Sequence, residues 1–271
     1  MEARQISFDD PSKLESLVAP DEVVYLITGA NRGIGWTLLK YLVLRPNIVV
    51  IACVRRLTTQ FTDNLENITS HPTSRVLISE LPDLNGSEPS SDQKWDNIRT
   101  SLEAGIHGFH IDVLIANAGT NTPYVSAKDA TPADFRLGFG VNVIGPLNLF
   151  RTFRTLLLAA KEPKFIAISS LGGSIETGPD LGPMTSYGSS KAALNYLTRK
   201  IHVDEERITT LAMDPGFVQT DMGGIFAAVL GIEKPPVTAV ESATGILKRI
   251  DELDKTTSGR FLDIEGKVNP W

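Results

Sequence analysis

Cysteine is nearly absent from this sequence. Cys53 is the only cysteine among the 271 residues, so the chain cannot form an intramolecular disulfide. It lies in the apolar run Ile48–Val54, where a cysteine is typically a small buried hydrophobic residue rather than a reactive thiol. The sequence therefore predicts no redox role for this thiol.

Long apolar runs are missing too. No stretch reaches the ~18 apolar residues of a membrane-spanning helix, and residues 1–21 are acidic and lack the apolar core of a signal peptide. Basic runs are also absent, and 32 acidic against 26 basic residues give a net charge of -6. That balance argues against a nucleic-acid or anionic-membrane surface. We expect a cytoplasmic protein with no membrane or nucleic-acid partner, and we assign no metal site.

What the sequence does contain is an alternation of short β-branched runs with longer amphipathic stretches. This alternation is typical of βα units in a parallel sheet. It predicts an α/β, Rossmann-type doubly wound, seven-stranded parallel sheet flanked by helices on both faces. The predicted strands are Val23–Thr28, Ile48–Val54, Arg75–Glu80, Val113–Ala116, Lys164–Ser169, Ile208–Asp214 and Arg260–Ile264.

Helices are expected to begin near Gly33, Trp95, Thr131, Tyr187 and Thr238. The polar stretch Leu81–Gln93 and the stretch Gly172–Pro183, rich in Gly and Pro, are predicted loops. With no interdomain linker and no repeat, we expect a loosely held N-terminal arm, residues 1–21, before a single domain, residues 22–271. The apolar segment Gly223–Val237 is predicted to be a mobile flap over a hydrophobic or aromatic substrate.

A glycine-rich turn follows the first predicted strand, with the sequence Thr28-Gly29-Ala30-Asn31-Arg32-Gly33-Ile34-Gly35. Glycine allows a tight turn and lets the backbone approach a pyrophosphate closely, and the N-terminus of the following helix favours the anion. In this strand–turn–helix context the turn predicts dinucleotide binding.

Tyr187 and Lys191 stand four residues apart at the start of a predicted helix, which places both on one face. A free tyrosine has a pKa near ~10, and a neighbouring ammonium stabilises the phenolate and lowers that pKa. The pair therefore predicts that Tyr187 is an acid–base catalyst assisted by Lys191.

Arginine takes the place of an acidic residue at the end of the second strand. An acid there would bind the 2′-hydroxyl of NAD and repel a 2′-phosphate, but the strand ends in Arg55 and Arg56, and Arg32 precedes Gly33. Guanidinium groups bind phosphate in bidentate fashion. This corner favours NADP(H) over NAD(H).

These motifs, in this order, resemble the short-chain dehydrogenase/reductase family over roughly Val23 to Trp271. The glycine turn is similar to the family's T-G-x-x-x-G-x-G, and Tyr187–Lys191 is similar to its Y-x-x-x-K. The segments Gly216–Gly224 and Asn269–Trp271 look like the branch of sniffer-type carbonyl reductases and fungal norsolorinic acid ketoreductase-like enzymes. The resemblance implies a reductase of ketones or aldehydes.

Further roles are implied by the resemblance alone. Asn142 would help to hold a water beside Lys191, and a serine after the fifth strand would bind the substrate carbonyl. Ser170 matches the strand-end pattern and Ser174 matches the commoner spacing to Tyr187, so we choose Ser170 and keep Ser174 as the alternative. The remaining residues expected at the cofactor are Asp83, Asn117, Ala118, Gly119, Pro215, Gly216, Val218 and Thr220.

We therefore expect an NADPH-dependent ketoreductase that acts on a small-molecule carbonyl. The alternatives are an alcohol dehydrogenase working in the oxidative direction and a non-catalytic protein that senses NADP(H). Because the helices of Asn142 and Tyr187 form dimer faces in many relatives, a homodimer or homotetramer is expected, although some members of the branch are monomers.

Overall fold

The computed structural model describes residues 3–10, 13–15, 17–83, 89–104 and 108–271. Over these residues the centre of the molecule is an eight-stranded parallel sheet in the order β1-β4-β3-β2-β5-β6-β7-β8. The strands are Ala3–Gln5 (β1), Val23–Thr28 (β2), Ile48–Val54 (β3), Arg75–Glu80 (β4), Val113–Ala116 (β5), Lys164–Ile168 (β6), Thr209–Asp214 (β7) and Arg260–Asp263 (β8). The predicted α/β fold is confirmed.

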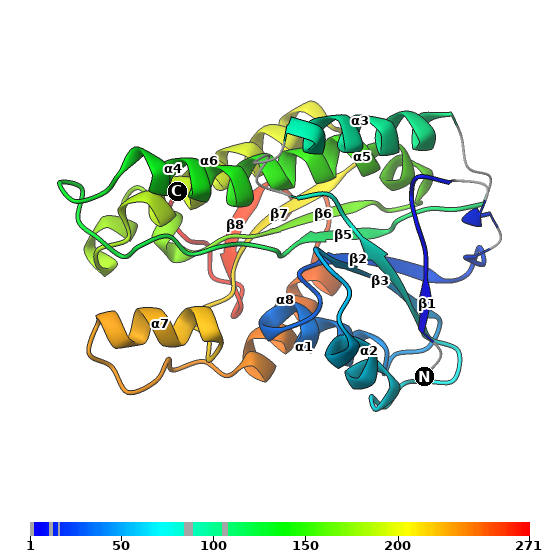
Figure 1. The fold of residues 1–271 in the computed structure, drawn as a ribbon, viewed down its shortest axis with the longest axis horizontal. Coiled ribbons are helices and arrows are strands. Elements are labelled where there is room, and N and C mark those ends of the chain that lie inside the picture. The colour runs from blue at the N-terminus through cyan, green and yellow to red at the C-terminus, as the bar shows by residue number, and fades with distance from the viewer. Residues whose placement is uncertain (1–2, 11–12, 16, 84–88, 105–107) are drawn as a thin grey trace.

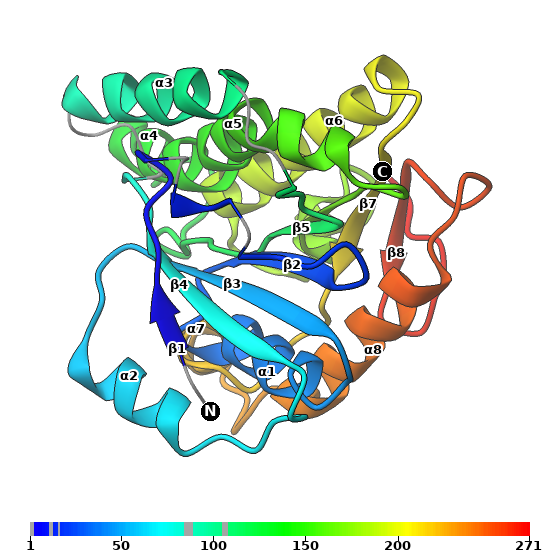
Figure 2. The same ribbon diagram turned by 90° about the vertical axis from the view of Figure 1, so that its right-hand side faces the viewer.

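Helices cover both faces of the sheet (Figures 1 and 2). One layer holds α3 (Pro89–Glu103), α4 (Pro132–Phe139), α5 (Gly145–Ala159) and α6 (Thr185–Asp204). On the opposite side lie α1 (Gly33–Leu42), α2 (Thr59–Glu66), α7 (Asp221–Val229) and α8 (Ala239–Glu252). None of the helices in the described ranges is both long and apolar enough to cross a membrane.

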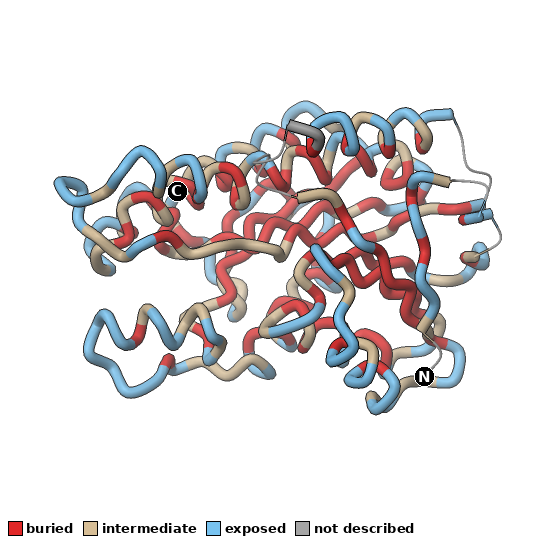
Figure 3. Tube along the Cα trace, viewed as in Figure 1, coloured by how far each residue is buried: buried red, intermediate tan, exposed pale blue. Residues whose placement is uncertain are grey.

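Two hydrophobic cores lie between the sheet and these layers. Successive strand side chains point to opposite faces, so Leu26 belongs to one core and Ile27 to the other. Figure 3 shows the strands as the most continuously buried part of the chain. Burial on both faces explains why the strands are apolar runs rather than alternating sequences.

The eighth strand is the main difference from the predicted sheet. Residues Ala3–Gln5 pair in parallel with β4, and Phe8, Leu14 and Val18 behind them are buried. A three-residue edge strand of sequence Ala-Arg-Gln carries no apolar pattern, so periodicity could not predict it. The segment expected to be a loosely held arm is packed against the sheet.

Several helices also differ from expectation. Helix α3 begins at Pro89, inside the predicted loop Leu81–Gln93, because proline suits the first turn of a helix; residues 84–88 of that loop lie outside the described residues. Helices α2 and α5 were not predicted, and α7 occupies the predicted flap. The predicted loop Gly172–Pro183 contains two short 3-10 turns.

The strand order places a topological switch point at β2, which pairs with β3 on one side and β5 on the other. Ligands of open α/β sheets bind at the carboxyl ends of the strands beside such a point. The glycine turn follows β2 and the Asn117 turn follows β5, so both lie at this edge.

Candidate active site

Glycine is required at several positions of the turn from β2 into α1, either by the backbone conformation or by a close contact with neighbouring backbone. Gly29 and Gly33 have left-handed backbones, with φ of 66° and 55°. A Cβ atom on Gly35 would lie 2.3 Å from the carbonyl oxygen of Gly29. Arg32 is the N-cap of α1 and makes no side-chain cap, so the helix N-terminus remains available to an anion.

The strand ends on either side of the switch point are joined by side chains. Thr28 Oγ1 accepts the N–H groups of Asn117 and Ala118 at 3.1 and 3.0 Å, and Asn117 Nδ2 donates to the Thr28 carbonyl at 2.8 Å. Thr28 is almost fully buried. Thr28 and Asn117 therefore hold the glycine turn against the end of β5.

The predicted phosphate corner is exposed and basic. Arg55 and Arg56 follow β3 on the surface. Arg32 pairs with Asp221, the first residue of α7, at 3.3 Å, and both side chains are largely exposed. The nearest acid on the neighbouring strand, Glu80, accepts a hydrogen bond from the N–H of Leu57.

Tyr187 and Lys191 lie in the first two turns of α6, as predicted. Lys191 Nζ donates to the Ile168 carbonyl at 2.8 Å and lies 5.7 Å from the centre of the Tyr187 ring. Burial lowers the pKa of Lys191 to about 8. Such a group is partly uncharged at neutral to alkaline pH.

The pKa of Tyr187 is raised, which corrects the expectation that Lys191 lowers it. Loss of solvation is the main cause, helped by nearby Tyr124 and by the charge of Asp214, whereas a hydrogen bond with Ser170 acts in the opposite direction. Tyr187 therefore keeps its proton at neutral pH in the cofactor-free structure. It is set up as a proton donor.

Asn142 lies in a π-helical turn, Gly140–Ile144, that joins α4 to α5. Its side chain binds both polar groups of the Thr120 backbone, at 2.9 and 3.0 Å, and donates to Ser190 Oγ at 2.9 Å. A Cβ atom on Gly119 would lie 3.3 Å from Asn142 Oδ1 and 3.6 Å from Lys191 Nζ. Asn142 thus ties the turn after β5 to α6 beside Lys191.

The two candidate serines differ in what they contact. Ser170 lies close enough to Tyr187 for its side chain to act against the rise in the tyrosine pKa, and its Oγ accepts the N–H of Gly172 at 3.1 Å. Ser174 is buried, its Oγ accepts the N–H of Thr177 at 3.1 Å and donates to the Trp271 carbonyl at 3.4 Å. The geometry brings Ser170, and not Ser174, to Tyr187.

The segment after β7 connects the cofactor side to the predicted flap. Val218 pairs with Val237, and the Gln219 N–H donates to the Val237 carbonyl at 2.8 Å. Thr220 caps α7, and a Cβ atom on Gly33 would lie 3.4 Å from Thr220 Cγ2. The flap therefore starts beside the glycine turn and is closed at its base by backbone pairing.

Aromatic rings connect the predicted flap to Tyr187. The Phe226 ring centre lies 4.6 Å from that of Tyr124 and 5.6 Å from that of Phe217. The Tyr124 ring is in turn 6.5 Å from Tyr187. Phe226 lies within the predicted flap, Gly223–Val237, whereas Tyr124 was not predicted because it stands in an irregular segment with no motif.

Asp83 and the rest of the predicted cofactor residues lie at the same sheet edge. The Asp83 carbonyl accepts hydrogen bonds from Ser91 Oγ at 3.1 Å and Trp95 Nε1 at 3.4 Å, which fixes its backbone against α3. Asn31 and Ile34 lie in the glycine turn and the first turn of α1. The Pro215 carbonyl accepts from Ser242 Oγ at 2.8 Å, and Gly216 has a left-handed backbone.

Comparison with known proteins agrees with this geometry. The short chain dehydrogenase family model matches residues 23–227. The norsolorinic acid ketoreductase of Aspergillus parasiticus is 37% identical over 261 residues, covering 93% of this chain and 92% of that protein.

Two solved carbonyl reductases are similar in structure. The NADPH-bound carbonyl reductase from chicken fatty liver has a TM-score of 0.76 and is 32% identical in sequence. The carbonyl reductase Sniffer of D. melanogaster also has a TM-score of 0.76 and is 26% identical. Each match covers 92% of this chain and 100% of the other chain. Together with the family model, these matches show that the chain belongs to the short-chain dehydrogenase family of oxidoreductases.

Proposed function

We propose that this protein is an NADPH-dependent ketoreductase that reduces an aromatic or polyketide-type ketone in the cytoplasm. The observation that carries the proposal is the placement of Lys191 Nζ 5.7 Å from the centre of the Tyr187 ring on α6, with the Ser170 side chain beside Tyr187. A binding protein without catalysis has no use for this arrangement. The names of the similar ketoreductase and carbonyl reductases support the same activity.

The residues present fit the cofactor. Gly29 and Gly33 have left-handed backbones, and the N-terminus of α1 has no side-chain cap, so its N–H groups remain available to a pyrophosphate. Arg32 and Arg55 provide exposed guanidinium groups for a 2′-phosphate. We assign the binding surface to Thr28, Gly29, Asn31, Arg32, Gly33, Ile34, Gly35, Arg55, Asp83, Asn117, Ala118, Gly119, Tyr187, Lys191, Pro215, Gly216, Val218 and Thr220.

Bound NADPH supplies the hydride. Ser170 Oγ orients the substrate carbonyl and stabilises its oxygen, and the Tyr187 hydroxyl donates a proton to that oxygen. Lys191 stabilises the phenolate that remains. The Asn142 side chain is occupied by its bonds to Thr120 and Ser190, so we assign the water beside Lys191 to its main-chain carbonyl.

The reductive direction is proposed from the basic corner at Arg32 and Arg55, which favours NADP(H) over NAD(H). The pKa of Tyr187 is raised, chiefly by loss of solvation, so the proton needed for reduction is present at neutral pH. The aromatic rings of Tyr124 and Phe226 beside Tyr187 favour a flat, apolar ketone, since aromatic pairs stack favourably.

The test is NADPH oxidation with a panel of aromatic ketones, quinones and aldehydes. Tyr187→Phe is expected to lower turnover at least ~100-fold while leaving NADPH binding intact, since it removes the proton donor and keeps the ring. Wild-type NADPH binding without turnover of any carbonyl would instead favour the sensing role.

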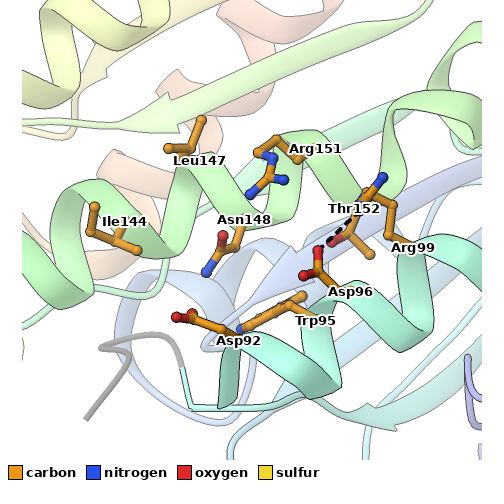
Figure 4. A pocket seen from close by; sticks show the side chains of 9 residues that line it. All are labelled: Asp92, Trp95, Asp96, Arg99, Ile144, Leu147, Asn148, Arg151 and Thr152. Atoms are coloured by element: carbon orange, nitrogen blue, oxygen red, sulfur yellow. Dashed lines mark hydrogen bonds and ion pairs between the residues drawn. The ribbon is translucent and has the colours of Figure 1, made fainter. Parts of the chain in front are cut away.

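We also propose a homodimer or homotetramer that forms through the layer containing α4, α5 and α6. Exposed apolar side chains on this layer are Leu137, Ile144, Tyr196 and Val203. A groove between α3 and α5 adjoins Ile144 and shares no residue with the active site (Figure 4). Light scattering would measure the assembly, and a monomeric mass would refute it.

A further inference from the structure

One carboxylate connects the two loops that carry the proposed chemistry. Asp214 is the last residue of β7 and only 8% exposed. Its Oδ1 accepts the N–H of Leu171 at 3.0 Å and the N–H of Gly216 at 3.4 Å. A buried carboxylate is costly unless it is hydrogen-bonded, and these two backbone bonds partly offset that cost.

The two bonds reach different parts of the site. Leu171 directly follows Ser170, whose side chain lies beside Tyr187 and acts on its pKa. Gly216 has a left-handed φ of 79° and begins the segment that leads to Thr220 and the flap. Asp214 therefore fixes the substrate-side serine relative to the segment on the cofactor side.

The charge of Asp214 also acts on Tyr187. The titratable and polar groups that face Tyr187 are Tyr124, Ser170, Lys191 and Asp214. Of these, Asp214 is the carboxylate, and its negative charge disfavours a phenolate on Tyr187. Asp263, which is paired with Asp214 on β8, is the acid that faces Asp214 itself.

We propose that Asp214 is a positioning residue that holds Ser170 beside Tyr187 through the Leu171 amide. Its charge acts on the same tyrosine, since a nearby carboxylate disfavours a phenolate. The inference rests on the proposed reductase. It differs from the roles of Ser170, Tyr187 and Lys191, because Asp214 acts through these groups.

Two substitutions separate the two effects. Asp214→Asn keeps an acceptor for the Leu171 and Gly216 amides but removes the charge, whereas Asp214→Ala removes both. The matched control is Asp263→Asn, which removes a neighbouring charge at the end of β8 and leaves both of those amide bonds in place. Asp263 Oδ1 accepts the N–H groups of Glu265 and Lys267 and makes no bond to Leu171 or Gly216.

The pH profile tests the charge. In Asp214→Asn, the inflection of alcohol oxidation with NADP⁺ is expected to move to lower pH by about half a unit or more, since the phenolate is no longer opposed by a carboxylate. Substrate KM should change less than ~3-fold. A profile that coincides with that of Asp263→Asn would overturn the proposed charge effect.

A double-mutant comparison tests the positioning. Ser170→Ala is expected to lower kcat ~100-fold in the wild type but less than ~10-fold in Asp214→Ala, because the serine is already displaced. Equal losses in both backgrounds would overturn the positioning role.

Amide hydrogen exchange provides a readout that does not need turnover. The Leu171 amide should exchange at least ~10-fold faster in Asp214→Ala than in the wild type or in Asp263→Asn. Unchanged exchange contradicts the positioning role, even if no substrate is found. Conversely, faster exchange in a protein that lacks all reductase activity would support the positioning and refute the proposed function.

Discussion

Burial of Lys191 opposes its proposed role, because burial disfavours the charged ammonium that would stabilise the Tyr187 phenolate. The residue is 4% exposed, and burial lowers the pKa of its ammonium from 10.5 to about 8. Between these values the unfolded chain binds more protons than the folded protein, so the free energy of unfolding rises with pH over this window. Below about pH 8 both states are protonated and the full cost of the buried charge remains.

Lys191→Met is therefore expected to stabilise the cofactor-free protein near neutral pH while abolishing turnover. The pKa shift corresponds to about 3 kcal/mol, and the lost bond to Ile168 costs about 1 kcal/mol, so the net gain is about 2 kcal/mol. Urea unfolding near neutral pH and at about pH 9.5 would measure it. Lys200→Met, at an exposed position, is the control; a variant no more stable than this control would refute the buried-charge explanation.

Gly35 provides a second residue-scale prediction. In Gly35→Ala the new methyl group would lie 2.3 Å from the Gly29 carbonyl oxygen, so the turn must open. We expect NADPH affinity to fall at least ~10-fold and the melting temperature to drop.

The control for this change is Gly224→Ala in α7. A Cβ atom there meets nothing within 4 Å, and alanine favours a helix by about 0.5–1 kcal/mol over glycine. Calorimetry and fluorescence titration of NADPH would compare the two variants. Equal NADPH affinity and equal melting temperature in the two variants would mean that the close contact between Gly35 and the Gly29 carbonyl matters neither for NADPH binding nor for stability.

At the scale of elements, α7 occupies part of the segment that the sequence predicts to be a flap over the substrate. Sequence patterns predicted a flap over Gly223–Val237 because the segment is apolar and contains Pro235 and Pro236. They could not predict the contact of Phe226 with Tyr124, since Tyr124 comes from the distant segment between β5 and α4. The mobility of the flap stays a prediction.

Phe226→Ala is expected to raise KM for aromatic ketones at least ~10-fold with a smaller change in kcat, because it removes a ring that the proposed function places against the substrate and leaves Ser170 and Tyr187 unchanged. The adjacent Ile225 is 52% exposed, so Ile225→Ala is the matched control. Steady-state kinetics with a large and a small ketone would show the difference. A kcat effect without a KM effect would argue against a binding role for the ring.

At the scale of the whole molecule, the N-terminal segment is part of the packed structure. Phe8 is 2% exposed and its ring lies edge-on to Phe153, with centres 4.8 Å apart. Phe153 belongs to α5. Phe8, which precedes the first predicted strand, is therefore part of the same hydrophobic core as the helices and strands of residues 22–271. The division into an arm, residues 1–21, and a single domain, residues 22–271, stays a prediction.

Phe8→Ala is expected to reduce the free energy of unfolding by about 3–5 kcal/mol, the usual cost of removing a buried aromatic ring. Urea unfolding would measure the loss, with the exposed position Gln5→Ala as control. A loss below about 1 kcal/mol would mean that the segment detaches in solution and that the arm is loosely held after all.

The amino-acid sequence by itself determined the parallel α/β sheet, the glycine turn and the Tyr187–Lys191 pair, because each depends on local spacing and periodicity. Tertiary structure decided what depends on distant segments meeting. It placed Ser170 rather than Ser174 at Tyr187, raised the pKa of Tyr187 by enclosing it, and brought Tyr124 and Asp214 to the site. It also added β1, whose three residues become a strand only because β4 offers an edge to pair with.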